Sequence, residues 1–314
     1  MKSRCSSWSP YGLNDWASLC QRDYGLESPI LWTKYLREAA PLETGVRTTK
    51  MESLTTLLFK VSEHVAYITL NRPTAVNSVS LELAEELHEV ARECEDSNSV
   101  RAALLTGAGR IFCGGGDLKS FAAQEPSHLP AHIKRVNLFF HSAIQCFARM
   151  RAPVVVAVNG PAGGYGMSLA SAGDIVLANE SARFTIAYTS VGLTPDASST
   201  YYLPRIIGLR RTMELALTNR TLAAREAEAI GLVTRVVPDE QLMPQAEALA
   251  NELAHGPTRA YGGVKRLLYS TATNPLYEQM ELENETIADM ARSADAQEGI
   301  AAFLAKRQPQ FSGR

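Results

Sequence analysis

A run of valines that ends in a cluster of glycines constrains this chain more than any other feature. Residues 153–158, Pro-Val-Val-Val-Ala-Val, form a short apolar run that is typical of a buried strand. Residues 159–166 contain four glycines, and the stretch from Met167 to Ala170 favours a helix. Such a strand, turn and helix start leave several main-chain N–H groups unpaired at one point, where the helix dipole favours negative charge. The stretch therefore predicts a cradle for an oxyanion or a phosphate.

A second glycine-rich strand exit lies upstream of the first. Residues 102–106 predict a strand, glycines follow at 107 and 109, and three more glycines occupy 114–116. If the two exits face one another, one N–H group from each can hold a single oxygen on which negative charge develops. The lysine of a Walker motif is missing after these glycines, which argues against hydrolysis of a nucleoside triphosphate.

Composition excludes several classes of function. The net charge of −2, with scattered Lys and Arg, gives no electrostatic reason to expect binding to nucleic acid or to a membrane surface. No apolar run approaches the roughly 18 residues of a membrane-spanning helix. The five cysteines are widely separated and show no Cys-x-x-Cys spacing. This predicts neither a metal site nor a disulfide framework, and a reducing, cytoplasmic location fits best.

Periodicity predicts a chain that is rich in strands early and helical late. Residues 54–60 and 65–70 favour a hairpin, and Ser80 is placed to cap a helix from Leu81 to about Cys94. Because a strand at 102–106 follows, parallel pairing is expected. Further elements are predicted as a long helix at 130–153, strands at 175–178 and 182–186, and helices at 209–218, 223–230, 241–254, 259–269, 275–291 and 297–306.

Taken together, the motifs resemble those of the crotonase (enoyl-CoA hydratase/isomerase) superfamily. They lie at 71–73, 75–77, 112–119, 159–170 and 192–196. The resemblance covers residues 51–314 and implies an α/β fold, a crotonase-like spiral of ββα units over 51–245. It also implies a C-terminal helical trimerisation module over 246–314, used in a homotrimer or a dimer of trimers. Residues 1–50 show no periodicity and are expected to form a loosely ordered N-terminal extension, with a docking arm for a neighbouring subunit as the alternative.

The resemblance also implies roles for individual residues in binding an acyl-CoA thioester. The N–H groups of Gly116 and Tyr165 are expected to form an oxyanion hole for the thioester carbonyl. Coenzyme A enters as part of the substrate, so no separate cofactor is expected. Its binding is expected to involve the main chain around Gly114, Gly115, Asp117 and Leu118, with Arg72 near the phosphates and Phe303 and Lys306 supplied by the C-terminal helix of a neighbouring subunit.

The side chains favour isomerisation over hydration. Hydratases of the family use two glutamates, and those positions hold Ser168 and Tyr188, which are expected to line the substrate site. A hydroxyl is a poor general base near neutral pH, so the two-glutamate mechanism does not transfer. Asp196 stands where several isomerases of the superfamily carry their acidic residue, and we expect it to move a proton between two substrate carbons. The alternative interpretation of Asp196 is a helix N-cap.

Three other functions stay open at this point. The region around His141 and Asp196 also resembles 4-chlorobenzoyl-CoA dehalogenase, in which those positions hold a base and a nucleophile, with Tyr188 in place of a supporting tryptophan. His141 could equally be a hydrogen-bonded residue of the core. The missing glutamates could indicate an acyl-CoA binder that has lost catalysis. Ser168, Asp196 and His255 follow the chain order of an α/β-hydrolase triad, although Ser168 lies too far beyond the strand for a nucleophile elbow.

Overall fold

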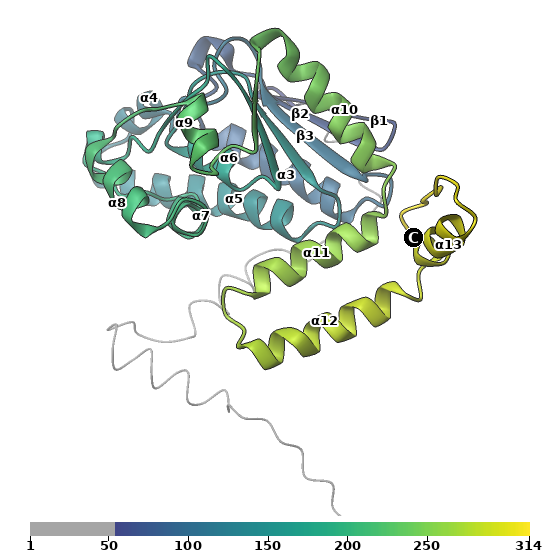
Figure 1. The fold of residues 1–314 in the computed structure, drawn as a ribbon. Coiled ribbons are helices and arrows are strands. Elements are labelled where there is room, and N and C mark those ends of the chain that lie inside the picture. The colour runs from purple at the N-terminus through teal and green to yellow at the C-terminus, as the bar shows by residue number, and fades with distance from the viewer. Residues whose placement is uncertain (1–53) are drawn as a thin grey trace, which may run out of the picture. The chain divides into compact units, whose positions relative to one another are not determined.

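The computed structural model describes residues 54–314, so the predicted extension at 1–50 lies outside the described residues. A six-stranded sheet with the order β1-β2-β3-β4-β6-β9 forms the centre of this part (Figure 1). Strands β1 (Leu57–Ser62) and β2 (Val65–Leu70) are antiparallel, and they confirm the predicted hairpin. Glu63 and His64 make its turn with φ angles of 48° and 65°, which suit a tight two-residue hairpin loop.

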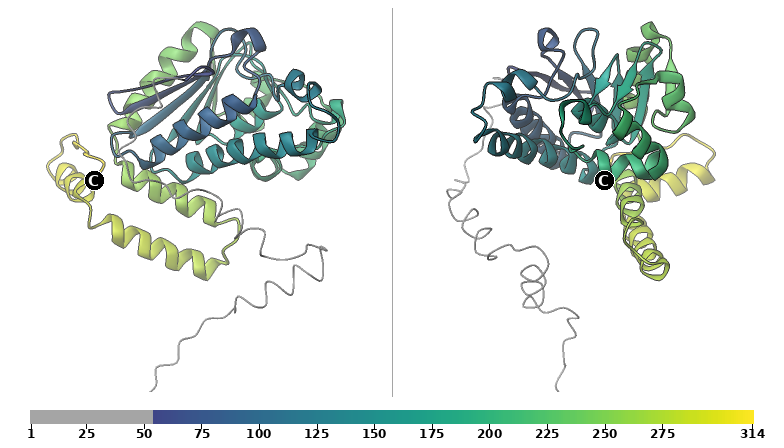
Figure 2. Two further views of the ribbon diagram at one scale, coloured as in Figure 1. Left: turned by 180° about the vertical axis from the view of Figure 1, so that it is seen from behind. Right: turned by 90° about the vertical axis from the view of Figure 1, so that its left-hand side faces the viewer.

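The rest of the sheet is parallel and carries helices on both faces. Its strands are β3 (Ala102–Gly107), β4 (Val154–Val158), β6 (Ile175–Asn179) and β9 (Arg235–Val237). Helices α3 (Leu81–Asp96) and α5 (Leu129–Arg149) lie side by side on one face, and α10 (Leu242–Ala254) covers the other (Figures 1 and 2). A hydrophobic core lies on each face of the sheet, because successive side chains of a strand point to opposite faces. Leu105 packs toward α3 and α5, and the neighbouring Leu104 packs toward α10.

Most of the predicted helices and strands are confirmed. The hydroxyl of Ser80 accepts a hydrogen bond from Leu83 N at 3.3 Å and so caps α3 as expected. Strand β9 was not predicted, and the helix after Asp196 was implied only by the alternative interpretation of Asp196 as an N-cap. The shorter elements are β5 (Ala162–Gly163), β7 (Arg183–Thr185), β8 (Leu222–Ala223), α4 (Leu118–Ala122), α6 (Tyr165–Ser171), α7 (Ser199–Ile206), α8 (Leu209–Thr218) and α9 (Ala224–Ala229).

Three further helices, α11 (Thr258–Ser270), α12 (Leu276–Met290) and α13 (Ala294–Leu304), follow the sheet domain. Lys265 on α11 forms a 2.7 Å ion pair with Asp174 and donates to Phe147 O and Ala152 O, at 2.7 and 3.2 Å. The helices are present as predicted, whereas the boundary at residue 245 and trimerisation stay predictions. A boundary at 245 would fall within α10. Among residues 54–314, no helix is both long and apolar enough to cross a membrane.

Candidate active site

The two glycine-rich loops lie side by side, as the sequence predicts. Cys113 and Ala162 form a parallel bridge, in which Cys113 N donates to Pro161 O at 3.2 Å and Gly163 N donates to Cys113 O at 2.9 Å. When the same register is continued, Gly116 lies opposite Tyr165. A Cβ atom added to Gly116 would lie 3.4 Å from Cε2 of the Tyr165 ring, which confirms that the two residues are neighbours.

Glycine is required where the loops approach most closely. A Cβ atom at Gly166 would lie 2.3 Å from Cys113 O, so any side chain there would force the loops apart. Gly115 has a φ of 110°, a conformation that other residues rarely adopt. These two glycines therefore permit the contact on which the site depends.

The loop from Gly114 to Asp117 is also held on its other side. Gly114 N donates to Val76 O at 2.9 Å, Val79 N donates to Gly115 O at 2.7 Å, and Asp117 N donates to Val79 O at 3.0 Å. The N–H groups of Gly116 and of Tyr165, the first residue of α6, have no acceptor within residues 54–314. Unpaired N–H groups on two fixed and neighbouring residues are what an oxyanion hole requires, and the convergence of these two on one carbonyl oxygen stays a prediction.

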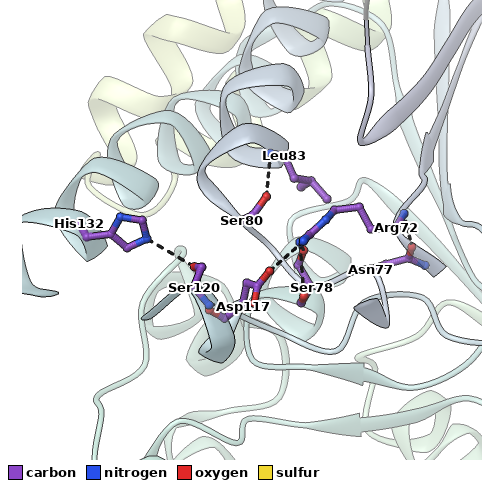
Figure 3. A network of polar contacts seen from close by, with 8 residues as sticks. All are labelled: Arg72, Asn77, Ser78, Ser80, Leu83, Asp117, Ser120 and His132. Atoms are coloured by element: carbon purple, nitrogen blue, oxygen red, sulfur yellow. Dashed lines mark hydrogen bonds and ion pairs between the residues drawn. The ribbon is translucent and has the colours of Figure 1, made fainter. Parts of the chain in front are cut away.

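Arg72 links this loop to the turn after β2 (Figure 3). Its Nη2 forms an ion pair with Asp117 Oδ2 at 2.9 Å, and its Nη1 donates to Ser78 O at 2.6 Å. Burial raises the pKa of Asp117, but the hydrogen bond from Arg72 and that from Ser120 N outweigh it, so the net shift is downward. The guanidinium is thus engaged within the protein, and its contact with coenzyme A phosphates stays a prediction.

Asp196 directs its carboxylate toward the same loops. Its Oδ2 accepts hydrogen bonds from Asn137 Nδ2 at 3.1 Å and from the Tyr165 hydroxyl at 3.0 Å. The carboxylate does not cap α7, because the N–H and hydroxyl of Ser199 bond to the main-chain oxygen of Asp196, at 3.0 and 2.7 Å, and Ser198 is the N-cap residue. The capping interpretation of this side chain is therefore wrong, and the carboxylate lies beside a residue of the predicted oxyanion hole.

Two neighbours of this carboxylate, Tyr165 and Asn137, differ in how well the sequence revealed them. Tyr165 is 3% exposed and packs edge-on against Phe140, with ring centroids 4.9 Å apart. Burial, followed by the charge of Asp196, raises the pKa of Tyr165, so its hydroxyl stays a proton donor. Asn137 was missed by sequence reasoning. The available signal was its position on α5 one turn before His141, which places the two side chains on the same face of the helix.

His141 contacts the main chain next to Asp196 rather than the carboxylate. Its Nε2 accepts a hydrogen bond from Ala197 N at 3.1 Å, so in this arrangement Nε2 is unprotonated and the ring proton lies on Nδ1. Ala197 and Ser198 have φ angles of 52° and 69°, in the left-handed region that costs residues other than glycine about 1 kcal/mol or more each. The imidazole therefore stabilises the strained turn that positions Asp196.

Ser168 and Tyr188 form a buried pair below the loops. The Ser168 hydroxyl is fully buried, donates to Gly164 O at 3.1 Å and shares a hydrogen bond with the Tyr188 hydroxyl at 3.2 Å. Burial, and next the charge of Asp196, raise the pKa of Tyr188.

The hydrolase triad considered from the sequence is not assembled. His255 bonds through Nδ1 to Asn251 O at the end of α10 instead of contacting Ser168.

The remaining predicted contacts to coenzyme A lie on exposed parts of the chain. Leu118 is 50% exposed at the start of α4, and Phe303 on α13 is 81% exposed. Lys306 follows α13 and is exposed too, and Figure 1 shows this helix well away from α4. Their roles stay predictions. In the described part of the chain, no three His, Cys, Asp or Glu side chains gather in a way that could hold a metal ion.

Comparison with known proteins identifies the family. The family model described as enoyl-CoA hydratase/isomerase matches residues 60–314. The chain belongs to the enoyl-CoA hydratase/isomerase family. It is 41% identical over 258 residues to a 1,2-epoxyphenylacetyl-CoA isomerase of Escherichia coli (strain K12), a match that covers 82% of this chain and 98% of that protein.

Two other relatives show the range of chemistry that the family names cover. The chain is 35% identical over 245 residues to 4-chlorobenzoyl coenzyme A dehalogenase-2 of Arthrobacter sp, covering 78% of this chain and 89% of that protein. The crystal structure of an enoyl-CoA hydratase from Bacillus anthracis is similar with a TM-score of 0.78 and 31% identity, covering 83% of this chain and all of that one. The predicted crotonase fold is thus confirmed, and the protein is an acyl-CoA enzyme of this family. Because relatives carry the names of different reactions, the reaction of this protein has to be argued from the residues of its site.

Proposed function

We propose that this protein isomerises the carbon–carbon double bond of an unsaturated acyl-CoA thioester, with Asp196 as the acid and base. The N–H groups of Gly116 and Tyr165 would hold the thioester oxygen. Asp196 would take a proton from the α-carbon, the electron pair would form the thioester enolate, and the same carboxyl would return the proton to the γ-carbon. The double bond moves from the β,γ to the α,β position, and no other reactant is consumed.

The observation that carries the proposal is the contact between Asp196 and Tyr165. The 3.0 Å hydrogen bond from the Tyr165 hydroxyl supports it, because the carboxylate contacts the side chain of the residue whose main-chain N–H is expected to hold the thioester oxygen. An acid and base must lie within reach of the carbon next to the carbonyl that the oxyanion hole binds. Ser168 and Tyr188, which occupy the hydratase glutamate positions, offer only hydroxyls, so a single carboxylate supports proton transfer better than addition of water.

His141 supports isomerisation over a hydrolytic reaction. A histidine that activates water needs a free lone pair on a ring nitrogen, and the lone pair of Nε2 already accepts the hydrogen bond from Ala197 N. Dehalogenase-like hydrolysis is the second candidate, because the relative from Arthrobacter carries that name and because His141 and Asp196 lie at one turn.

The test is turnover of a panel of straight-chain, cyclic and aromatic thioesters by the wild-type protein and by Asp196→Asn and His141→Gln. We expect conversion of a β,γ-unsaturated thioester to its conjugated isomer, loss of turnover with nearly intact coenzyme A affinity in Asp196→Asn, and a persisting reaction in His141→Gln. A trapped acyl- or aryl-enzyme in His141→Gln would establish the dehalogenase-like route instead. Tight binding of thioesters with no turnover of any of them would identify a binder without catalysis.

Further expectations rest on the family resemblance. We propose that coenzyme A binds along Gly114, Gly115, Asp117 and Leu118, that the chain assembles as a homotrimer or a dimer of trimers, and that it is cytoplasmic. Sedimentation of the purified protein tests the assembly, and a monomer at micromolar concentration would contradict it.

A further inference from the structure

The two oxygens of the Asp196 carboxylate have different surroundings. Oδ2 accepts two hydrogen bonds, from Asn137 Nδ2 and from the Tyr165 hydroxyl. Oδ1 is buried and has no hydrogen-bond partner within residues 54–314. An unpaired buried acceptor is costly, by about 1–3 kcal/mol, so such a group in a folded protein calls for an explanation.

Asn137 can adopt only one orientation in this network. The Tyr165 hydroxyl lies 2.5 Å from Asn137 Oδ1 and 3.0 Å from Asp196 Oδ2, so its single proton faces two acceptors. With this orientation, the amide nitrogen donates to the carboxylate and the amide oxygen accepts from the phenol. A reversed amide would set its oxygen against the carboxylate. The single Tyr165 proton is shared between Asn137 Oδ1 and Asp196 Oδ2, with the shorter distance to Asn137, so Asn137 Nδ2 makes the full bond to Oδ2 and the phenol supports both the amide and the carboxylate.

Tyr165 connects this network to the predicted oxyanion hole. Its N–H group is one of the two unpaired amides, and its hydroxyl bonds to Asp196. The ring between these two groups is buried against Phe140, so their relative positions are fixed. The main chain of Asp196 is fixed as well, through the bonds from Ser199 to its carbonyl oxygen and from Ala197 N to His141. Rotation of the carboxylate would break the bonds to Oδ2.

We propose that Asn137 and the hydroxyl of Tyr165 clamp Oδ2 of Asp196, so that Oδ1 alone carries the proton between the two substrate carbons. The proposal rests on the isomerase function and assigns Asn137 as a positioning residue. Oδ1 takes the α-proton and holds it while the enolate forms, then returns it to the γ-carbon. Because Oδ1 cannot exchange places with Oδ2 and faces the bound substrate during the transfer, the hydrogen that it takes returns to the substrate instead of exchanging with water.

The experiment compares Asn137→Leu and Tyr165→Phe with the matched control Gln145→Leu, an exposed amide on the same helix. Tyr165→Phe keeps the ring and the main-chain N–H, so it tests the hydroxyl alone even if Asn137→Leu folds poorly. We expect kcat to fall roughly 10- to 100-fold in each clamp variant, with KM within about twofold, since one hydrogen bond to a charged group is removed. With substrate deuterated at the α-carbon, wild type and Gln145→Leu retain deuterium at the γ-carbon, and the clamp variants lose it to solvent.

A second readout needs no substrate. The antisymmetric and symmetric stretching bands of a carboxylate lie further apart when its two oxygens are hydrogen-bonded unequally. For Asp196, the two bands are obtained from the difference between isotope-edited infrared spectra of wild type and of Asp196→Asn. We expect the separation to narrow in both clamp variants and to stay unchanged in Gln145→Leu. Unchanged bands, or unchanged kcat and deuterium retention, in both clamp variants would overturn the clamp. If the wild type isomerises no thioester, the proposed function fails, and the infrared bands still decide whether Oδ2 is clamped.

Discussion

Replacing Arg72 by Met separates a structural role for this residue from a role in binding coenzyme A. The guanidinium contacts Asp117 and Ser78, and the side chains of Arg72 and Asp117 are 22% and 12% exposed. Arg72→Met removes an ion pair and a hydrogen bond at a largely buried position and leaves Asp117 without its cation. From the worth of charged hydrogen bonds and the cost of breaking a buried pair, we expect the free energy of unfolding to fall by about 2–4 kcal/mol at pH 7.

The pH dependence of this loss follows from the lowered pKa of Asp117. A carboxylate with a lowered pKa in the folded state stabilises the protein above the unfolded pKa, near about 3.9, and this contribution is lost as pH falls through the folded pKa. The difference between wild type and Arg72→Met should therefore shrink as the pH is lowered below about 4. It should not vanish, because the hydrogen bond to Ser78 O is independent of pH.

Urea unfolding at fixed protein concentration, at pH 7 and in steps down to pH 3, measures this difference, with the exposed Arg110→Met as a matched control. We expect kcat to fall as well, because Asp117 follows Gly116 directly and its N–H bonds to Val79 O. Unchanged stability together with a higher KM that responds to salt would refute the structural role and support the predicted contact with phosphates.

Three further changes test other parts of the structure. Gly166→Val, whose Cβ atom would meet Cys113 O at 2.3 Å, should separate the two loops and reduce kcat/KM at least about 100-fold; retained activity would show that the loop contact is dispensable. Lys265→Met should destabilise the fold by about 3 kcal/mol because it leaves the largely buried Asp174 carboxylate without its cation and with the bond from Val154 N, and urea unfolding measures this loss. The double variant with Asp174→Asn should recover most of the loss. Burial lowers the pKa of Lys265 and raises that of Asp174, so the site disfavours the charged form of each residue, and replacing both by neutral side chains should cost little.

Local sequence signals were sufficient for most of the framework. The hairpin around Glu63 and His64, the cap at Ser80 and the two glycine-rich loops depend on turn chemistry and periodicity within a few residues, and each is confirmed. That the two glycine-rich exits lie side by side followed from the rule that neighbouring parallel strands end at one edge of a sheet, whereas the register of Cys113 with Ala162 came from the structure.

The features that were missed depend on contacts between distant parts of the chain. Strand β9 has three residues and pairs with β6 far earlier in the sequence. Helix α7 was implied only by the N-cap alternative for Asp196, and its true start was missed because it follows two left-handed residues, Ala197 and Ser198. Asn137 lies on an amphipathic helix, where its position one turn before His141 was the only sequence signal, and its contact with Asp196 shows its place in the site.

A crystal structure of Asp196→Asn with a β,γ-unsaturated acyl-CoA bound tests the central claim most directly, because this variant should bind the substrate without converting it. The thioester oxygen should lie about 2.7–3.1 Å from both Gly116 N and Tyr165 N, with the α-carbon next to the side chain at position 196. A thioester oxygen bonded to neither amide, or a substrate whose α-carbon lies away from that side chain, would contradict the account.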